Sequence, residues 1–190
     1  MPVLYTTAQD GYVYASSTSS FAAARDATTG AANPLGSRYA YSVRASRAFS
    51  RGTTTWTFVR SFFEFDTSDI HVMPSVAQLS IYGFAFVTAD MFVVKSRQGA
   101  SLGNEDFAAI DGWVAGADNS SNVTKYSDEI TTWSNSGYNA IILNSRARAD
   151  MAAVDRFTLC CIEADYDLVN NVPGADFSAV SASDFIPLST

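Results

Sequence analysis

A run of aromatic and β-branched residues at positions 55–65 constrains the fold of this chain more than any other feature. It reads Thr-Trp-Thr-Phe-Val-Arg-Ser-Phe-Phe-Glu-Phe, and such side chains pack well on the pleated surface of a β-strand. The large apolar residues switch parity between Phe62 and Phe63, so a regular strand cannot place all of them on one face. The pattern therefore predicts a strand with a change of register near Ser61, for which a β-bulge is the usual device.

Segments of similar character recur along the chain, separated by turn residues. We expect strands at residues 10–15, 37–45, 76–83, 91–96, 127–133, 138–143 and 156–164, and short helices within residues 104–113 and 145–153. Eight or nine short strands with two helical turns predict an all-β fold, a Greek-key jelly-roll β-sandwich. Because the chain has 190 residues and neither a linker nor an internal repeat, we expect a single domain over residues 1–190.

Three other segments are rich in polar or small residues and predict long surface connections. They are residues 16–34, residues 114–124 and the acidic residues 165–190, the last with an edge strand at residues 184–188. Such segments contribute little to a hydrophobic core, so we expect them to be free to meet a partner.

The charge of the chain narrows its partners. Its formal net charge is −7, and no basic patch offsets the repulsion that nucleic-acid phosphates or an anionic membrane would exert. No apolar run approaches the roughly 20 residues of a membrane-spanning helix. The first residues show neither the basic nor the apolar region of a secretory signal. We therefore expect no nucleic-acid partner, no membrane partner and no signal-dependent secretion.

Residues for nucleophilic or zinc chemistry are scarce. Cys160 and Cys161 are adjacent, and neighbours on a strand point to opposite faces, so we expect two buried free thiols. His71 is the only histidine and precedes Pro74 in what reads as a turn between strands. Neither cysteine lies at zinc-ligand spacing from a second cysteine or from the histidine.

Acidic residues leave one enzymatic route open, because glycoside hydrolysis needs two carboxyl groups across a cleft. Two groups lie near strand ends. Glu64, Asp66 and Asp69 cluster after the aromatic strand, and Glu163, Asp165 and Asp167 alternate on another strand, which would place them on one face. Capping of turns is the interpretation we favour for them. Structural calcium is the alternative, since calcium takes oxygen ligands from loop aspartates, and its candidate ligands are Asp165 and Asp167. We expect no enzymatic activity and no other cofactor.

The three tryptophans could stack on sugar rings or pack in the core. Trp56 and Trp133 lie within strand patterns, which favours packing. Trp113 follows Gly112 at the end of a predicted helix, so it is the candidate ligand-binding residue.

A motif around the aromatic strand resembles a known family. The chain reads Arg60-Ser61-Phe62-Phe63-Glu64-Phe65-Asp66-Thr67-Ser68-Asp69-Ile70 and then Pro74-Ser75-Val76-Ala77-Gln78-Leu79-Ser80-Ile81-Tyr82-Gly83. This resembles the strand, turn and strand of DNRLRE-type jelly-roll domains, which are related to carbohydrate-binding modules. Asp10-Gly11-Tyr12-Val13 is similar to the start of that family, and Ile130-Thr131-Thr132-Trp133 stands where the family often has a Trp-containing strand. The family's final strand is poorly marked here, so its sugar-binding residues are not carried over.

Residues 106–113 and 133–139 are also similar to segments of phage-encoded proteins of this type. The resemblance implies a non-enzymatic virion structural protein of a bacteriophage, made and assembled in the host cytoplasm. We expect capsid decoration or cementing by a homo-oligomer, such as a trimer, bound to the major capsid protein. The alternatives are a phage tail or fibre module and a carbohydrate-binding module that recognises polysaccharide.

Overall fold

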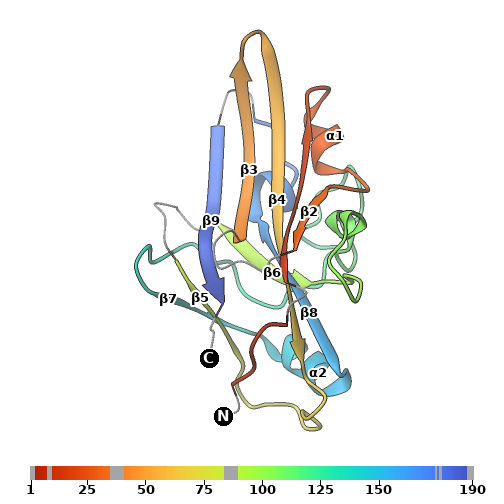
Figure 1. Cartoon of the computed structure of the whole chain (residues 1–190), viewed down its shortest axis with the longest axis vertical. Coiled ribbons are helices and arrows are strands. Elements are labelled where there is room, and N and C mark those ends of the chain that lie inside the picture. Colours follow the sequence, from red (N-terminus) through yellow and green to blue (C-terminus); the bar gives the residue numbers. More distant parts are fainter. Residues whose placement is uncertain are drawn as a thin grey trace.

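A computed structural model describes residues 3–7, 10–34, 41–83, 90–173, 175 and 177–187 (Figure 1). The strands are β1 (Gly11–Ser17), β2 (Ala31–Pro34), β3 (Tyr41–Ser50), β4 (Thr53–Asp66), β5 (Gln78–Tyr82), β6 (Met91–Lys95), β7 (Tyr138–Ile142), β8 (Arg156–Glu163) and β9 (Phe177–Pro187). Short helices interrupt them: α1 (Phe21–Arg25), the 3-10 helix η1 (Asn104–Ala108), α2 (Ser145–Ala153) and the π-helix η2 (Ala164–Leu168). The predicted all-β class is confirmed.

The described strands pair antiparallel in one branched sheet. Neighbours run in the order β2-β1-β4-β3-β9-β5-β7, and β8 joins β4 to β6. The predicted helix within residues 145–153 is confirmed as α2, which Asn144 caps by accepting hydrogen bonds from the N–H groups of Arg146 and Ala147. None of the helices in the described residues is long and apolar enough to cross a membrane.

Strand β4 changes partner along one edge. Residues 53–59 pair with β3, and residues 61–66 pair with β8. Strand β1 pairs with residues 56–62 and overlaps both partners, so it occupies the opposite edge. The sheet therefore forks at Arg60, where β3 and β8 diverge.

The predicted β-bulge near Ser61 is wrong. The register between β1 and β4 runs unbroken from Trp56 to Phe62. Both parities of β4 are buried because the strand has a hydrophobic cluster on each face. Phe58 and Phe62 belong to the first cluster, and Phe63 belongs to the second.

Strands β6 and β8 continue this two-sided layer, which explains their near-continuous apolar sequences. Phe92, Val94, Cys160 and Ile162 lie in the first cluster, whereas Met91, Val93, Leu159 and Cys161 lie in the second. Side chains of β1, α1 and η1 cover the first cluster, and side chains of β5, β7 and α2 cover the second.

A long hairpin of β3 and β4 projects from this body (Figure 1). Ser50 pairs with Thr53, so its turn consists of two residues. Arg51 and Gly52 have φ angles of 51° and 83°, the left-handed pair that matches the twist of the flanking strands.

Two of the predicted surface connections contribute to the core instead. Residues 16–34 contain the end of β1, α1 and β2, and Phe21, Ala24 and Arg25 are buried. The helix forms there because the Ser20 hydroxyl accepts a hydrogen bond from the N–H of Ala23. Within residues 114–124, Asn119 and Val123 are buried.

Two strand predictions also differ from the structure. Residues 127–133 form only a bridge between Ile130 and Met91, not a regular strand. The expected edge strand at residues 184–188 belongs to β9, which is flanked by β3 and β5 and is therefore not an edge. Residue 188 and residues 37–40 of another predicted strand lie outside the described residues.

Candidate functional sites

A buried ion pair lies where β4 forks. The Arg60 guanidinium donates to the two carboxylate oxygens of Asp167, at 2.8 and 2.6 Å, and both side chains are fully buried. It also donates to the carbonyl oxygens of Phe107 and Arg25, at 2.6 and 3.0 Å. Arg60 thereby ties the central layer to η2, η1 and α1, and its charge is compensated as buried charges require.

Arg25 extends this arrangement. Its guanidinium donates to the carbonyl oxygens of Asp167, Ala117 and Leu168, at 2.6, 2.9 and 3.3 Å. Burial lowers the pKa of Arg25 from its usual value, while the nearby Asp167 carboxylate opposes that shift. The half-buried Trp113 ring contacts both cations, with its centroid 4.6 Å from Arg25 and 4.1 Å from Arg60. We call Arg25, Arg60, Trp113 and Asp167 the arginine cluster.

The arginine cluster accounts for two of the sequence candidates. Trp113 covers buried guanidinium groups and is not an exposed platform for a ligand. Asp167 has both carboxylate oxygens on Arg60. No local sequence pattern indicates this pairing, because Arg60 and Asp167 are 107 positions apart.

Asp165 lies in a different group of carboxylates. Ligand atoms of Asp90, Glu163 and Asp165 lie within 4.8 Å of one another. Burial raises the pKa of Asp90, with further contributions from hydrogen bonding and charge at Glu129. Burial and the charge of Asp90 raise the pKa of Asp165. Oxygen ligands of this kind suit calcium. The structure groups Asp165 with Asp90 and Glu163, however, and not with the expected Asp167, whose carboxylate binds Arg60.

Glu163 holds the start of η2 within this group. Its carboxylate accepts hydrogen bonds from the N–H groups of Asp165, Tyr166 and Asp167, at 3.1, 2.8 and 2.9 Å. Burial raises the pKa of Glu163 to about 8 despite these bonds. The expected strand alternation of Glu163, Asp165 and Asp167 is wrong, because β8 ends at Glu163 and a helical turn follows.

The carboxylates after the aromatic strand have structural contacts. Glu64 accepts hydrogen bonds from Arg156 and from the Thr7 hydroxyl, and Asp66 caps the turn at Ser68. Asp69 is exposed.

Glu64 and Glu163 are not placed as a hydrolytic pair. Glu64 pairs with Thr158, and Glu163 lies five residues further along β8, a separation of about 16 Å at strand spacing. A glycosidase pair lies within roughly 10 Å.

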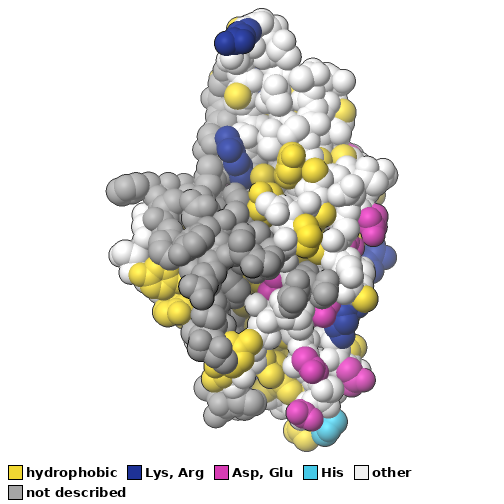
Figure 2. All heavy atoms as spheres, viewed as in Figure 1, with side chains coloured by type: hydrophobic (Ala, Val, Ile, Leu, Met, Phe, Trp, Pro, Cys, Tyr) yellow, Lys and Arg dark blue, Asp and Glu magenta, His cyan; other side chains and the backbone are white. Residues whose placement is uncertain are grey.

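The cysteines and the histidine lie where the sequence indicated. Cys160 and Cys161 are buried free thiols on opposite faces of β8, which confirms that prediction. Burial raises the pKa of Cys161 to about 12 and raises that of Cys160 well above its usual value. His71 is exposed between β4 and β5, and Figure 2 shows the histidine at the lower tip with acidic side chains nearby.

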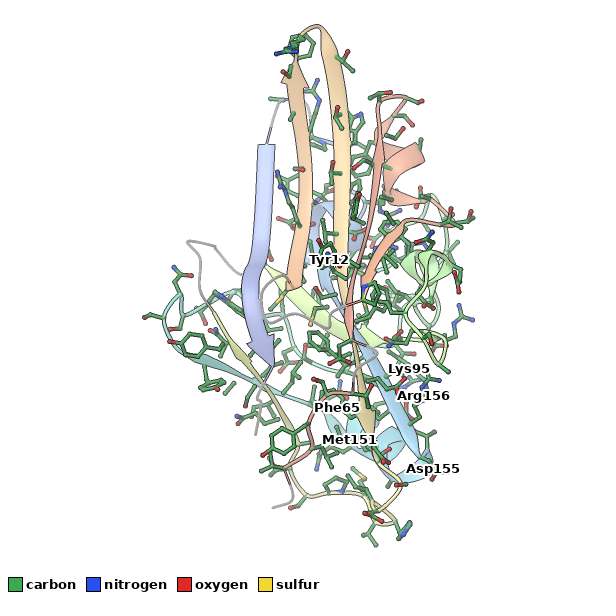
Figure 3. The ribbon with its side chains drawn as sticks, viewed as in Figure 1. Tyr12, Phe65, Lys95, Met151, Asp155 and Arg156 are labelled. Atoms are coloured by element: carbon green, nitrogen blue, oxygen red, sulfur yellow. The ribbon has the colours of Figure 1, made fainter. Side chains whose placement is uncertain are left out.

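Three hollows complete the set of candidate sites. A groove of about 770 Å³ beside the turn end of the β3–β4 hairpin is lined by Trp56, Arg47, Asp26 and Asn170, among others. An apolar hollow of about 510 Å³ lies between residues 3–6 and the second cluster, lined by Phe65 and Met151 (Figure 3).

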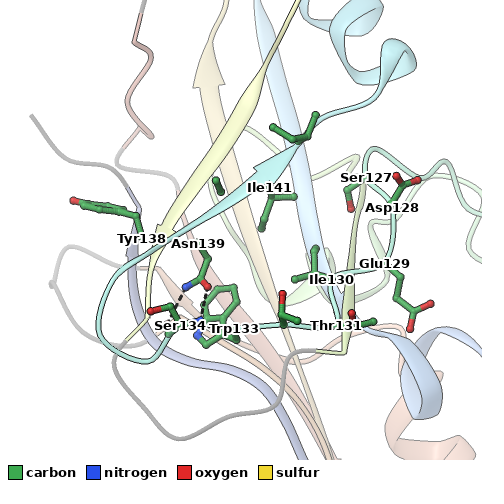
Figure 4. Close-up of a pocket in the computed structure, with 13 residues that line it drawn as sticks. Ser127, Asp128, Glu129, Ile130, Thr131, Trp133, Ser134, Tyr138, Asn139 and Ile141 are labelled. Carbon is green, nitrogen blue, oxygen red and sulfur yellow. Dashed lines mark hydrogen bonds between the residues drawn. The ribbon is translucent and has the colours of Figure 1, made fainter.

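The third hollow is a groove of about 600 Å³ between β7 and residues 127–134 (Figure 4). The sequence predicts none of the three hollows, because each forms only when strands and connecting segments pack together. No protein-family model and no curated protein matches the chain.

Proposed function

We propose that the chain is a non-enzymatic structural protein of a bacteriophage particle that acts by presenting rigid surfaces to other virion proteins. Capsid decoration is the assigned role, and a tail or fibre position is the alternative. The jelly-roll resemblance comes from the motif at residues 60–70 and 74–83, and the virion context comes from the likeness of residues 106–113 and 133–139 to phage-encoded proteins.

The arginine cluster is the observation that carries the surface-presenting role. It joins α1, η1, η2 and the carbonyl of Ala117 to one buried guanidinium pair. Connections fixed in this way lose little conformational entropy when they bind a partner. A decoration protein needs such a preorganised outer surface because it joins neighbouring subunits without any chemical step.

Mass spectrometry of purified particles tests this role directly. We expect peptides of the chain in intact particles of the phage that encodes it, and removal of tails by fractionation should leave them with the capsid. Analytical ultracentrifugation of the isolated chain should show a homo-oligomer. Absence from purified particles would overturn the proposal.

A second function, polysaccharide binding, is favoured by the groove at Trp56. This groove combines an aromatic ring with Asp26, Asn170 and hydroxyl side chains, the mixture that stacks on and hydrogen-bonds to sugars. The Arg47 guanidinium lies over the Trp56 ring at 5.1 Å and Phe21 meets it edge-on at 5.5 Å, so the ring is held in place.

A glycan array separates this function from the first. The intact chain should bind at least one polysaccharide, Trp56→Ala should abolish that binding, and Trp113→Phe should preserve it. Failure of every glycan to bind, or equal binding by Trp56→Ala, would remove polysaccharide recognition at this groove.

A further inference from the structure

Two of the ends of the branched sheet face each other across the groove of Figure 4. One end is β7, which pairs only with β5 among the described strands. The other is the segment at residues 125–130, which bridges β6 through Val94 with Lys125 and Met91 with Ile130.

Two ties hold the walls of the groove together at its ends. The N–H of Asn144 donates to the Tyr126 carbonyl at 2.8 Å, and the N–H of Ser134 donates to the Asn139 side chain at 2.6 Å. Gly83 permits the second tie, because a Cβ there would lie 2.1 Å from the Ser134 carbonyl oxygen. Between these ties the walls part and enclose about 600 Å³.

The free edge of β7 follows from its register. Leu143 donates its N–H to the Ala77 carbonyl at 2.9 Å, and Gly83 donates to the Gly137 carbonyl at 3.0 Å. Since bonded pairs alternate in an antiparallel ladder, the odd-numbered residues of β7 face β5. The N–H and C=O groups of Tyr138, Ala140 and Ile142 therefore point toward the groove, without a hydrogen-bond partner in the described part of the chain.

The opposite wall is open in the same way. Asp128, Thr131 and Thr132 are exposed, and their main-chain groups have no hydrogen-bond partner among the residues described. Ile141, which is buried, and the half-buried Ile130 supply apolar lining between the walls. An extended chain in the groove would gain backbone hydrogen bonds from both sides and alternate side-chain contacts, as in strand addition.

The charge of the groove selects the occupant. Asp128 and Glu129 are exposed on its rim, and no Lys or Arg is among its described lining residues. Glu129 adjoins Asp90, which belongs to the carboxylate group with Glu163 and Asp165. A cationic side chain at this end would relieve the repulsion among these carboxylates.

We propose that this groove binds an extended segment of a partner protein that carries Lys or Arg near the end beside Glu129. The inference deepens the proposed structural role, and rests on it only for the identity of the partner. A second copy of the chain fits less well, because it would bring its own Asp128 and Glu129 to an acidic edge.

The test uses the isolated full chain and a fluorescent probe peptide, acetyl-Lys-Val-Thr-Val-Thr-Val-amide. We expect saturable binding in fluorescence anisotropy. The affinity should be about tenfold higher than for the same peptide with Glu in place of Lys, and it should decrease as the salt concentration rises. Methylation of alternate backbone nitrogens of the peptide should remove binding. Amide signals of Tyr138, Ala140 and Ile142 should shift in the NMR spectrum as the probe is added.

A matched pair of variants localises the site. Ala140→Pro removes one N–H that faces the groove and leaves the ladder to β5 intact, so it should weaken the probe about fivefold or more. Ala140→Val keeps that N–H and should bind as the unaltered chain does. Thermal unfolding of both variants confirms that they fold.

Three results would overturn the inference. They are no binding of the lysine peptide at millimolar concentration, equal binding by Ala140→Pro, and a self-association that Ala140→Pro abolishes. The last would assign the edge to a second copy. None of them bears on the presence of the chain in particles, so the proposed structural role is judged separately.

Discussion

The Asp167 carboxylate accepts two hydrogen bonds from the Arg60 guanidinium, at 2.8 and 2.6 Å, where neither side chain is exposed to solvent. Arg60 lies on β4 between the residues that pair with β3 and those that pair with β8, so the ion pair is buried at the point where the sheet forks.

Removal of one partner should therefore be costly. Asp167→Ala leaves a buried cation without its counter-ion and should lower the free energy of unfolding by about 3 to 5 kcal/mol, measured by urea denaturation. The double variant Arg60→Met/Asp167→Leu should lose less than Asp167→Ala alone. Asp128→Asn, at an exposed carboxylate, is the control and should change stability by under about 0.5 kcal/mol. Equal stability of Asp167→Ala and the unaltered chain would contradict this role.

The Trp113 ring should stabilise the same cluster. Trp113→Ala removes the aromatic face that contacts Arg25 and Arg60 and should cost about 2 to 4 kcal/mol, whereas Trp113→Phe should cost less. Urea denaturation measures both variants. A loss of glycan binding by Trp113→Phe without any loss of stability would instead support the ligand-binding role suggested by the sequence.

Because both thiols are buried, they should react slowly in the native chain, and the stability of the native chain should fall at alkaline pH. Cys160 and Cys161 should resist a thiol reagent at pH 8 in the native chain and react fully in guanidinium chloride. Their pKa values are raised in the native state, so above about pH 8.5 the unfolded chain ionises first. Stability should then fall as the pH rises toward 12. Rapid labelling of either thiol in the native chain would show that β8 is more open than the structure indicates.

Glu163 should make the stability of the folded chain decrease as the pH rises from about 4.5 to about 8. Its pKa is about 8 in the folded chain against an ordinary value of 4.5, so the native state holds a proton that the unfolded state has lost. Its contribution should therefore favour folding below about pH 4.5 and decline as the pH rises toward 8.

Urea denaturation between pH 5 and pH 8 checks this contribution. Glu163→Gln should make the slope of unfolding free energy against pH less negative. Glu105→Gln, the same change at an exposed site, is the matched control. An unchanged slope in Glu163→Gln would contradict the shifted pKa.

The local features of the fold could be predicted from sequence, whereas the sites depend on distant segments. The burial of Cys160 and Cys161 on opposite faces follows from strand geometry alone. The parity change at Phe62 and Phe63 is a real signal, but its cause is a strand buried on both faces. A single sequence does not distinguish that cause from a bulge, because the second face is covered by segments elsewhere in the chain.

The candidate sites show the same limit. Ser20 and Asn144 are typical helix caps, yet residues 16–34 still looked like a loop because α1 has only five residues. The groove beside β7 forms from two ties between segments, and neither tie has a sequence signature.

The fork in β4 also determines how the molecule can come apart. Strands β4, β6 and β8 supply side chains to both hydrophobic clusters. If the segments that cover one cluster unfold, the side chains of these strands on that face are exposed, so the other half of the molecule does not keep a complete core. Amide hydrogen exchange in the most buried strands that contact either hydrophobic cluster should therefore give one common free energy of opening. Limited proteolysis should correspondingly release no stable half-molecule.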